Sequence, residues 1–254
     1  APAQHEIDLK YGDALAMADN LMTFKQAVKT IAKRPGLHAS FMPKPKQNIN
    51  GSGMHINMSL SRDGVNIFAN PENEKELSKE ARYFMGGLLK YMKGMAAITN
   101  PLINSYKRLI PGYEAPVYIA WSTQNRTPLI RIPMTKGEGQ RIELRSPDPS
   151  SNPYLVLAVC LAAGLDGIRN QIEPPESVEG NLYELSEQEK NDIGLERLPE
   201  NLNEAVRELE KSEFICNVLG DHIVKNYCKA KKAEWEEYTN QVTQWELDQY
   251  LYRI

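Results

Sequence analysis

Residues 54–60 read M-H-I-N-M-S-L, and residues 141–145 read R-I-E-L-R. In both stretches polar and apolar side chains alternate, which is the period of a β-strand with one buried and one polar face. The polar faces carry His55 on one strand and Glu143, between two arginines, on the other. On spacing alone, such a face is either a solvated surface with cross-strand ion pairs or a functional surface.

The sequence around these two strands predicts short strands mixed with helices. Alternation predicts a further strand over residues 3–11, and short strands are also predicted over residues 37–42, 117–121 and 129–132. Apolar side chains at helical spacing predict helices over residues 14–33, 74–98, 153–168, 204–216 and 221–248. The pair Asp63-Gly64 indicates a hairpin turn shortly after the first quoted strand.

Composition excludes several classes of protein. The 254 residues include 30 Lys and Arg and 33 Asp and Glu, a net charge of −3, and 41% are hydrophobic. These values are typical of a globular protein and exclude a disordered chain, a collagen-like chain and a globally basic nucleic-acid binder. The longest apolar stretch, residues 155–165, is about half of the ~20 residues that a membrane-spanning helix needs. The three scattered cysteines fit small buried side chains in a reducing cytosol.

Charge is unevenly distributed along the chain. Residues 107–145 hold seven basic and three acidic side chains, whereas residues 173–213 hold four basic and thirteen acidic ones. The acidic segment is typical of a solvated surface. In the basic segment the arginines lie among apolar residues, and an arginine fork binds phosphate or carboxylate even when it is partly buried. They predict either an anionic-substrate pocket or ordinary salt bridges, and they are Arg108, Arg126, Arg131, Arg141 and Arg145.

Three further features could carry chemistry. Neighbouring strands could bring Glu6, His55 and Glu143 to one point, and this donor set suits Mg²⁺ or Mn²⁺ better than a structural zinc ion. The stretch N-G-S-G at residues 50–53 is either an anion-binding loop of backbone N–H groups or a plain turn. Glu114 lies in P-G-Y-E-A-P, which is either an exposed surface loop or a loop that closes over a site.

Six strings in register resemble one enzyme family. They are A-P-A-Q-H-E-I (1–7), F-M-P-K-P (41–45), N-G-S-G-M-H-I-N-M-S-L (50–60), N-S-Y-K-R-L-I-P-G-Y-E-A-P (104–116), N-R-T-P-L-I-R-I-P (125–133) and R-I-E-L-R-S-P-D-P-S-S-N-P-Y-L (141–155). Through them the chain is similar to bacterial type I glutamine synthetase. The resemblance implies an α+β fold, with a curved, mainly antiparallel sheet and helices packed on its apolar face. It also implies that residues 1–254 are the C-terminal portion of the catalytic domain, with the family's N-terminal domain absent.

The resemblance implies a role for each matched residue. Glu6 matches a ligand of the metal on the glutamate side, whereas His55 and Glu143 match ligands of the metal that serves the nucleotide phosphates. Glu114 and Arg126 match catalytic residues, and Glu114 matches the flap that closes the glutamate entrance. The other matches are glutamate-binding Asn50, Gly51, Arg108, Arg126 and Arg145, and ATP-binding Asn57, Ser59, Arg126 and Arg131. Tyr183 aligns with a tyrosine that some members adenylylate, although unregulated members keep it too.

The implied activity is ATP-dependent ligation of ammonia to L-glutamate through γ-glutamyl phosphate, with Mg²⁺ or Mn²⁺. The implied assembly is a cytoplasmic homo-oligomeric ring, with the C-terminal helix as a contact between subunits. Two alternatives stay open, a ligase of the same fold that joins glutamate to amines or polyamines, and a non-catalytic fragment or pseudoenzyme. Because several usual metal ligands fall outside the chain, we expect weak metal binding and no activity of the chain alone. We also expect an uncovered sheet edge that favours association.

Overall fold

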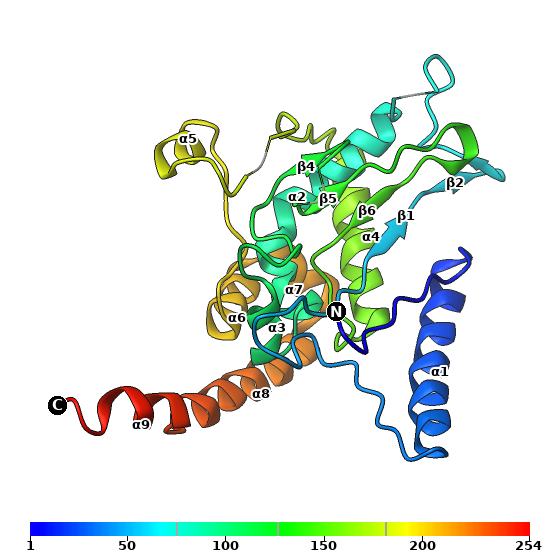
Figure 1. Cartoon of the computed structure of the whole chain (residues 1–254). Helices are drawn as coiled ribbons and strands as arrows, with labels where there is room; N and C mark the ends of the chain where they lie inside the picture. The colour runs from blue at the N-terminus through cyan, green and yellow to red at the C-terminus, as the bar shows by residue number, and fades with distance from the viewer. Residues whose placement is uncertain (75, 126, 181) are drawn as a thin grey trace.

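The computed structural model describes residues 1–74, 76–125, 127–180 and 182–254 (Figure 1). Its helices are α1 (Ala14–Lys33), α2 (Lys79–Thr99), α3 (Ile103–Arg108), α4 (Pro153–Arg169), α5 (Glu187–Asp192), α6 (Leu202–Lys211), α7 (Glu213–Leu219), α8 (Asp221–Thr239) and α9 (Gln244–Tyr250). Its strands are β1 (Ile56–Met58), β2 (Ser61–Arg62), β3 (Val65–Asn66), β4 (Trp121–Ser122), β5 (Ile130–Arg131) and β6 (Ile142–Leu144). A short 3₁₀ helix covers Gly137–Gly139. These elements confirm the α+β class.

The larger sheet runs in the order β1-β6-β5-β4. The β1–β6 and β6–β5 pairs are antiparallel and the β5–β4 pair is parallel, which confirms a mainly antiparallel sheet. The register aligns Ile56, Leu144, Ile130 and Trp121 in one row, and Leu144 and Ile130 are fully buried. Because successive side chains point to opposite faces, the residues one position along each strand form a polar row on the other face.

The apolar row packs into a core that α2 and α4 share (Figure 1). The two helices touch through glycines. A Cβ on Gly87 would lie 2.1 Å from the Ala163 carbonyl oxygen, and a Cβ on Gly167 would lie 2.1 Å from the Tyr83 carbonyl oxygen. The backbones of α2 and α4 therefore meet directly, and together the two helices form the support behind the sheet.

The predicted hairpin turn is confirmed. Asp63 and Gly64 join β2 to β3 with φ angles of 53° and 80°, and Arg62 pairs with Val65 across the turn. Positive φ at both central positions is the pattern of a type I′ turn, whose twist matches that of the strands it connects.

Two predicted strands do not form. Residues 3–11 and 37–42 belong to no sheet, and the side chains of residues 1–16 are all exposed. A strand needs a neighbour that satisfies its backbone hydrogen bonds. The N-terminal segment instead contacts the body through Gln4, whose amide donates to the Gly51 carbonyl oxygen at 2.8 Å and to Ser52 Oγ at 3.1 Å. The alternation of residues 3–11 was therefore not sufficient for a strand.

Three helices have bounds that differ from the prediction. The expected helix 204–216 is divided at Ser212, whose hydroxyl accepts from the Ile215 N–H at 3.4 Å and starts α7. The expected helix 221–248 is divided into α8 and α9, because Thr243 and Glu246 form a capping box that starts a new helix. The helix expected from residue 74 begins at Lys79, after the Ser78 cap.

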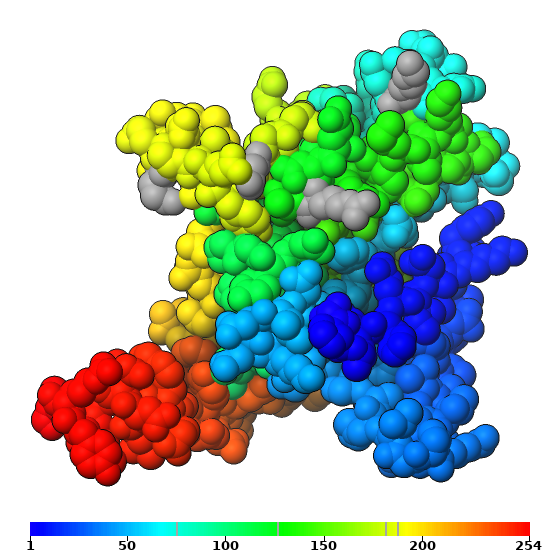
Figure 2. Space-filling view, viewed as in Figure 1, coloured from blue at the N-terminus to red at the C-terminus, as the bar shows by residue number. Residues whose placement is uncertain are grey.

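The C-terminal end of the chain extends from the body of the molecule, whereas the N-terminus lies against it (Figure 1). Figure 2 shows α8 and α9 as a red arm, and α1 with the N-terminal segment as a blue flank. Large apolar side chains stay exposed on each, including Tyr11 and Leu15 at one end and Trp245 and Leu251 at the other. Within the described ranges, no helix is long and apolar enough to cross a membrane.

Candidate active site

The polar row of the sheet lies on the face opposite the core. The register aligns Asn57 with Glu143, Glu143 with Arg131, and Arg131 with Ser122, across all four strands. His55 precedes β1 and reaches the same row, since its Nδ1 lies 3.1 Å from Glu143 Oε1. The structure thus brings together four residues that the sequence analysis assigned to metal and ATP binding, and it adds Ser122, which that analysis missed.

Glu143 is at the centre of this row. It is only 5% exposed, and its Oε2 lies 2.5 Å from Arg131 Nε while its Oε1 faces His55. Burial by itself raises the pKa of the Glu143 carboxyl. The hydrogen bond and charge of His55, followed by the charges of Arg131 and Arg145, outweigh burial and hold that pKa below its ordinary value. Glu143 is therefore a carboxylate at neutral pH, fixed between an imidazole and a guanidinium.

The predicted metal ligands are only partly assembled. His55 and Glu143 are in contact, but Glu6 lies in the exposed N-terminal segment. Across the ranges that the structure describes, no three His, Cys, Asp or Glu side chains gather into a metal-binding group. Glu6 does not meet the other two because residues 3–11 do not join the sheet beside β1, and the metal-binding roles of all three stay predictions. The pair that remains supplies two donors that a divalent cation accepts.

Arg108 lies at the end of α3 and is only 3% exposed. Its Nη1 donates to the Ser146 carbonyl oxygen at 2.6 Å, and its Nη2 donates to the Arg145 carbonyl oxygen at 3.0 Å. Burial lowers the pKa of Arg108 to about 10, while Asp148 opposes this shift and Arg145 adds to it, so the guanidinium stays charged at neutral pH. Gly51 packs against the same side chain, because a Cβ there would lie 3.1 Å from Arg108 Cγ. The glutamate-binding roles of Arg108 and Gly51 stay predictions.

Other predicted binding residues surround the polar row. Asn50 is half-buried beside Gly51, and Ser59 is exposed just after β1. Asn57 Oδ1 accepts a hydrogen bond from Arg141 Nε at 3.0 Å, which ties the ends of β1 and β6 together on the polar face. Their assigned contacts with glutamate or ATP also stay predictions.

The proline-bounded loop of residues 111–116 is held by side chains from distant parts of the chain. Glu114 is exposed and has a φ of 57°, a left-handed value that is uncommon outside glycine. Arg145 Nη2 donates to the Glu114 carbonyl oxygen at 3.4 Å, and the Tyr183 hydroxyl donates to the Ala115 carbonyl oxygen at 2.9 Å. Burial raises the pKa of Tyr183, so its hydroxyl keeps the proton that this hydrogen bond uses. Tyr183 therefore supports the loop that carries Glu114.

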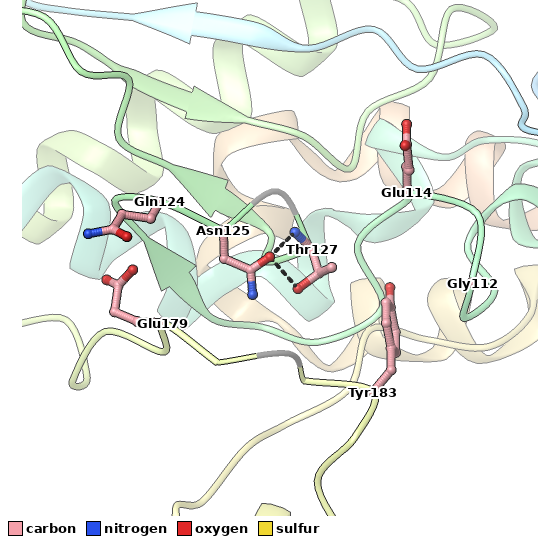
Figure 3. A pocket seen from close by; sticks show the side chains of 7 residues that line it. All are labelled: Gly112, Glu114, Gln124, Asn125, Thr127, Glu179 and Tyr183. Carbon is pink, nitrogen blue, oxygen red and sulfur yellow. Dashed lines mark hydrogen bonds between the residues drawn. The ribbon is translucent and has the colours of Figure 1, made fainter.

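A pocket of about 530 Å³ opens beside this loop (Figure 3). Glu114 and Tyr183 lie on one side of it, and Gln124 and Glu179 lie on the other. The complete lining is Gly112, Glu114, Gln124, Asn125, Thr127, Glu179 and Tyr183. Asn125 Oδ1 accepts from the Thr127 N–H at 2.9 Å and from the Thr127 hydroxyl at 3.0 Å. Arg126, which is predicted to be catalytic and to bind both substrates, lies outside the described residues.

Glu179 is a further site residue that the sequence analysis missed. The Ser122 hydroxyl donates to its Oε2 at 2.6 Å, and the Thr123 N–H donates to its Oε1 at 3.3 Å. Ser122 Oγ in turn accepts from the Asn125 N–H at 2.9 Å, so Glu179 helps to shape the loop after β4. No local pattern marks Glu179, because its acidic segment is typical of a solvated surface.

The fold and this site define an α+β domain whose sheet presents a buried carboxylate, an imidazole and a guanidinium on one polar face. The family described as the glutamine synthetase catalytic domain matches residues 1–250, and the chain belongs to that family.

Named relatives agree with this assignment. The chain is 60% identical to a glutamine synthetase of Clostridium saccharobutylicum, and 54% identical to those of Methanosarcina mazei and Thermotoga maritima. Each comparison covers 99% of this chain but only 56–57% of the relative, so the chain spans a little over half the length of these relatives.

Two solved structures are also similar. A GmaS–ADP complex matches with a TM-score of 0.85 and 40% identity, over 95% of this chain and 56% of that one. An apo GmaS without ligand matches with a TM-score of 0.84 and 41% identity, over 96% of this chain and 55% of that one. This chain therefore matches a little over half of each of these chains.

Proposed function

We propose that this chain supplies part of the active site of a glutamine synthetase, which ligates ammonia to L-glutamate with ATP. The observation that carries the proposal is the row of His55, Glu143 and Arg131, in contact on the polar face of the sheet, in a chain 60% identical to a glutamine synthetase. In this reaction the γ-phosphoryl group of ATP moves to the γ-carboxylate of glutamate and ADP leaves. Ammonia then attacks the acyl carbon of γ-glutamyl phosphate and phosphate leaves.

Two anions must approach each other in the first step, so cationic side chains have to offset their charge in the transition state. We assign Arg131 and Arg126 to the ATP phosphates, together with Asn57 and Ser59. For glutamate we assign Asn50, Gly51, Arg108 and Arg145. The position of Arg131 beside Glu143 supports its assignment, because the carboxylate fixes the direction of the guanidinium.

The acyl phosphate intermediate hydrolyses in water, so a loop has to cover it. We assign this task to residues 111–116. The Glu114 carboxylate would accept a proton from ammonium and leave ammonia as the nucleophile. The exposed position of Glu114 at the edge of a pocket supports this assignment.

The family uses a divalent cation, which offsets phosphate charge when it is bound. His55 and Glu143 would hold Mg²⁺ or Mn²⁺, because His55 Nδ1 and Glu143 Oε1 lie only 3.1 Å apart, close enough to share one ion, and the Glu143 carboxyl stays ionised. Glu6 would serve a second ion. Two donors are fewer than the roughly six ligands such cations take, so we expect weak binding in this chain.

The test is phosphate release from ATP and L-glutamate, with and without ammonium, first in Mg²⁺ and then in Mn²⁺. The chain is assayed alone and mixed with the part of the C. saccharobutylicum enzyme that it does not match. We expect ammonium-dependent release only in the mixture. Glu143→Gln and Arg131→Met should reduce the rate by about 100-fold or more, and Arg82→Met, at an exposed salt bridge, is the matched control. Release in neither preparation would favour the non-catalytic alternative and overturn the proposal.

The same assay distinguishes ammonia from other amines. Replacing ammonium with a short alkylamine or a polyamine tests the alternative ligase of this fold. If phosphate is released faster with the amine than with ammonium, the amine replaces ammonia as the assigned co-substrate. The assignments for glutamate and ATP do not change.

Assembly and location belong to the same proposal. We assign the protein to the cytoplasm and to a homo-oligomeric ring. The exposed apolar side chains of α9 support a subunit contact there, with Trp245 61% and Leu251, just after the helix, 58% exposed.

A further inference from the structure

A buried lysine contacts both the loop assigned to glutamate binding and the loop assigned to closing the site. Lys44 is only 7% exposed. Its backbone is fixed by Asn104 of α3, whose Oδ1 accepts from the Lys44 N–H at 2.7 Å and whose Nδ2 donates to the Lys44 carbonyl oxygen at 3.0 Å. Burial lowers the pKa of Lys44, because it removes water from the ammonium group. A cation in such a position needs protein groups to replace that water.

Two groups replace it, one from each loop. Lys44 Nζ donates to the carbonyl oxygen of Ile49, the residue directly before Asn50. The same Nζ lies 3.7 Å from the centre of the Tyr113 ring, directly before Glu114. This distance is well inside the ~6 Å range of cation–π attraction, which is stronger where water is excluded. One ammonium group therefore joins the N-G-S-G loop to the proline-bounded loop.

We propose that Lys44 is a positioning residue that couples the loop of Asn50 and Gly51 to the loop of Glu114. Lys44 acts through Ile49 and Tyr113, neither of which has an assigned role in binding substrate. A shift of the Ile49 carbonyl draws the ammonium away from the Tyr113 ring, so the two loops move together. The consequence for catalysis rests on the proposed function: glutamate that orders the first loop also orders the loop that carries Glu114. The coupling itself does not depend on that function.

Hydrogen–deuterium exchange of the 254-residue chain tests the coupling directly. Exchange is followed over residues 47–53 and 110–117, with residues 79–99 of α2 as the internal reference. Lys44→Met and Tyr113→Leu each remove one end of the contact, and each should speed exchange in both loops by about fivefold without changing α2. Lys44→Arg and Tyr113→Phe keep the cation and the ring, and should stay within about twofold of the parent chain. Lys46→Met, at an exposed lysine of the same segment, is the matched control and should change neither loop.

The decisive result is the exchange rate of residues 47–53 in Tyr113→Leu, because the substitution lies in the other loop. Tyr113→Leu leaves Lys44 and Ile49 intact, so faster exchange over residues 47–53 requires the ammonium to transmit the change. An effect confined to residues 110–117 overturns the proposal, and so do parental rates in both loops of Lys44→Met. If Lys44→Met unfolds the chain, which faster exchange in α2 would reveal, the Tyr113→Leu result decides alone. Because no readout uses ammonium-dependent activity, the coupling and the proposed function fail separately.

Discussion

The backbone of Glu114 lies in the left-handed region, with a φ of 57°. In this region a Cβ atom comes too close to the main chain, and glycine avoids the strain because it has no Cβ. The hydrogen bonds from Arg145 and Tyr183 to the loop's carbonyl oxygens maintain this conformation. We predict that Glu114→Gly has a free energy of unfolding about 1 kcal/mol higher than Glu114→Ala. Both variants remove the carboxylate, so urea unfolding of the pair isolates the backbone effect. Equal unfolding midpoints would show that the loop is not strained.

The Glu179 carboxyl gives a pH-dependent test at the same scale. Burial alone raises the pKa of this carboxyl, but hydrogen bonds from Ser122, Thr123 and Ser177 lower it below its ordinary value. A carboxyl whose pKa is lower in the folded than in the unfolded chain contributes stability above the unfolded value. It loses that contribution as the pH falls through the folded value.

We predict that Ser122→Ala raises the pKa of the Glu179 carboxyl, because it removes the 2.6 Å hydrogen bond to the ionised form. The loss of stability in acid that Glu179 causes should then be smaller and should be complete at a higher pH. NMR titration of the labelled Glu179 side chain measures the shift. Ser186→Ala is the matched control, since the Ser186 hydroxyl contacts Glu189 instead. An unchanged Glu179 titration in Ser122→Ala contradicts the assigned cause.

Single residues were predicted from the sequence where a local pattern marks them. Alternation placed His55, Asn57 and Glu143 on one polar face, and the observed register agrees. The pairing of Glu143 with Arg131 was not predicted, because the register between strands far apart in the chain depends on the whole sheet. Glu179 was missed for the same reason, since its partner Ser122 lies 57 positions away in the sequence.

Elements differ in how far a local pattern determines them. Residues 54–60 and 3–11 alternate equally well. Only the segment 54–60 pairs with another strand, and it does so at residues 56–58. Helices satisfy their hydrogen bonds internally, so α1, α2 and α4 appear close to where their apolar spacing predicts them. Their exact ends depend on caps, and Ser78, Ser212 and Thr243 moved or divided the predicted helices.

The contact between α2 and α4 yields a prediction at the element scale. Gly87→Ala and Gly167→Ala should each lower the free energy of unfolding by about 2–3 kcal/mol, because the added Cβ would lie 2.1 Å from a backbone oxygen of the facing helix. Gly139→Ala is the control, since its Cβ would lie 3.5 Å from Thr135, an ordinary contact. Urea unfolding of the three variants measures the difference. Similar midpoints for Gly87→Ala and Gly139→Ala would contradict direct contact of the helix backbones.

Across the whole molecule, the well-packed part is the sheet with α2, α4 and α6, and the uncovered part lies at its margins. In the described ranges β1 pairs with β6 on one side and with nothing on the other. The backbone groups along that side can accept another strand. Exposed apolar side chains of the N-terminal segment and of α9 form a second kind of surface that favours association (Figure 2).

We therefore predict that the chain self-associates, so that its weight-average mass rises as the concentration increases from about 1 μM toward the millimolar range. Sedimentation equilibrium measures this mass. Trp245→Ser combined with Leu251→Ser removes two exposed apolar side chains of the C-terminal arm, and Gln244→Ser combined with Gln249→Ser is the polar control. Loss of association only in the apolar pair assigns the contact to the arm around α9, as expected for a subunit contact there. Association that survives in both assigns it to the free edge of β1 or to the apolar N-terminal segment, because the substitutions around α9 change neither of them. A monomer over the whole concentration range would mean that none of these surfaces drives association. That result would contradict the proposed subunit contact at α9.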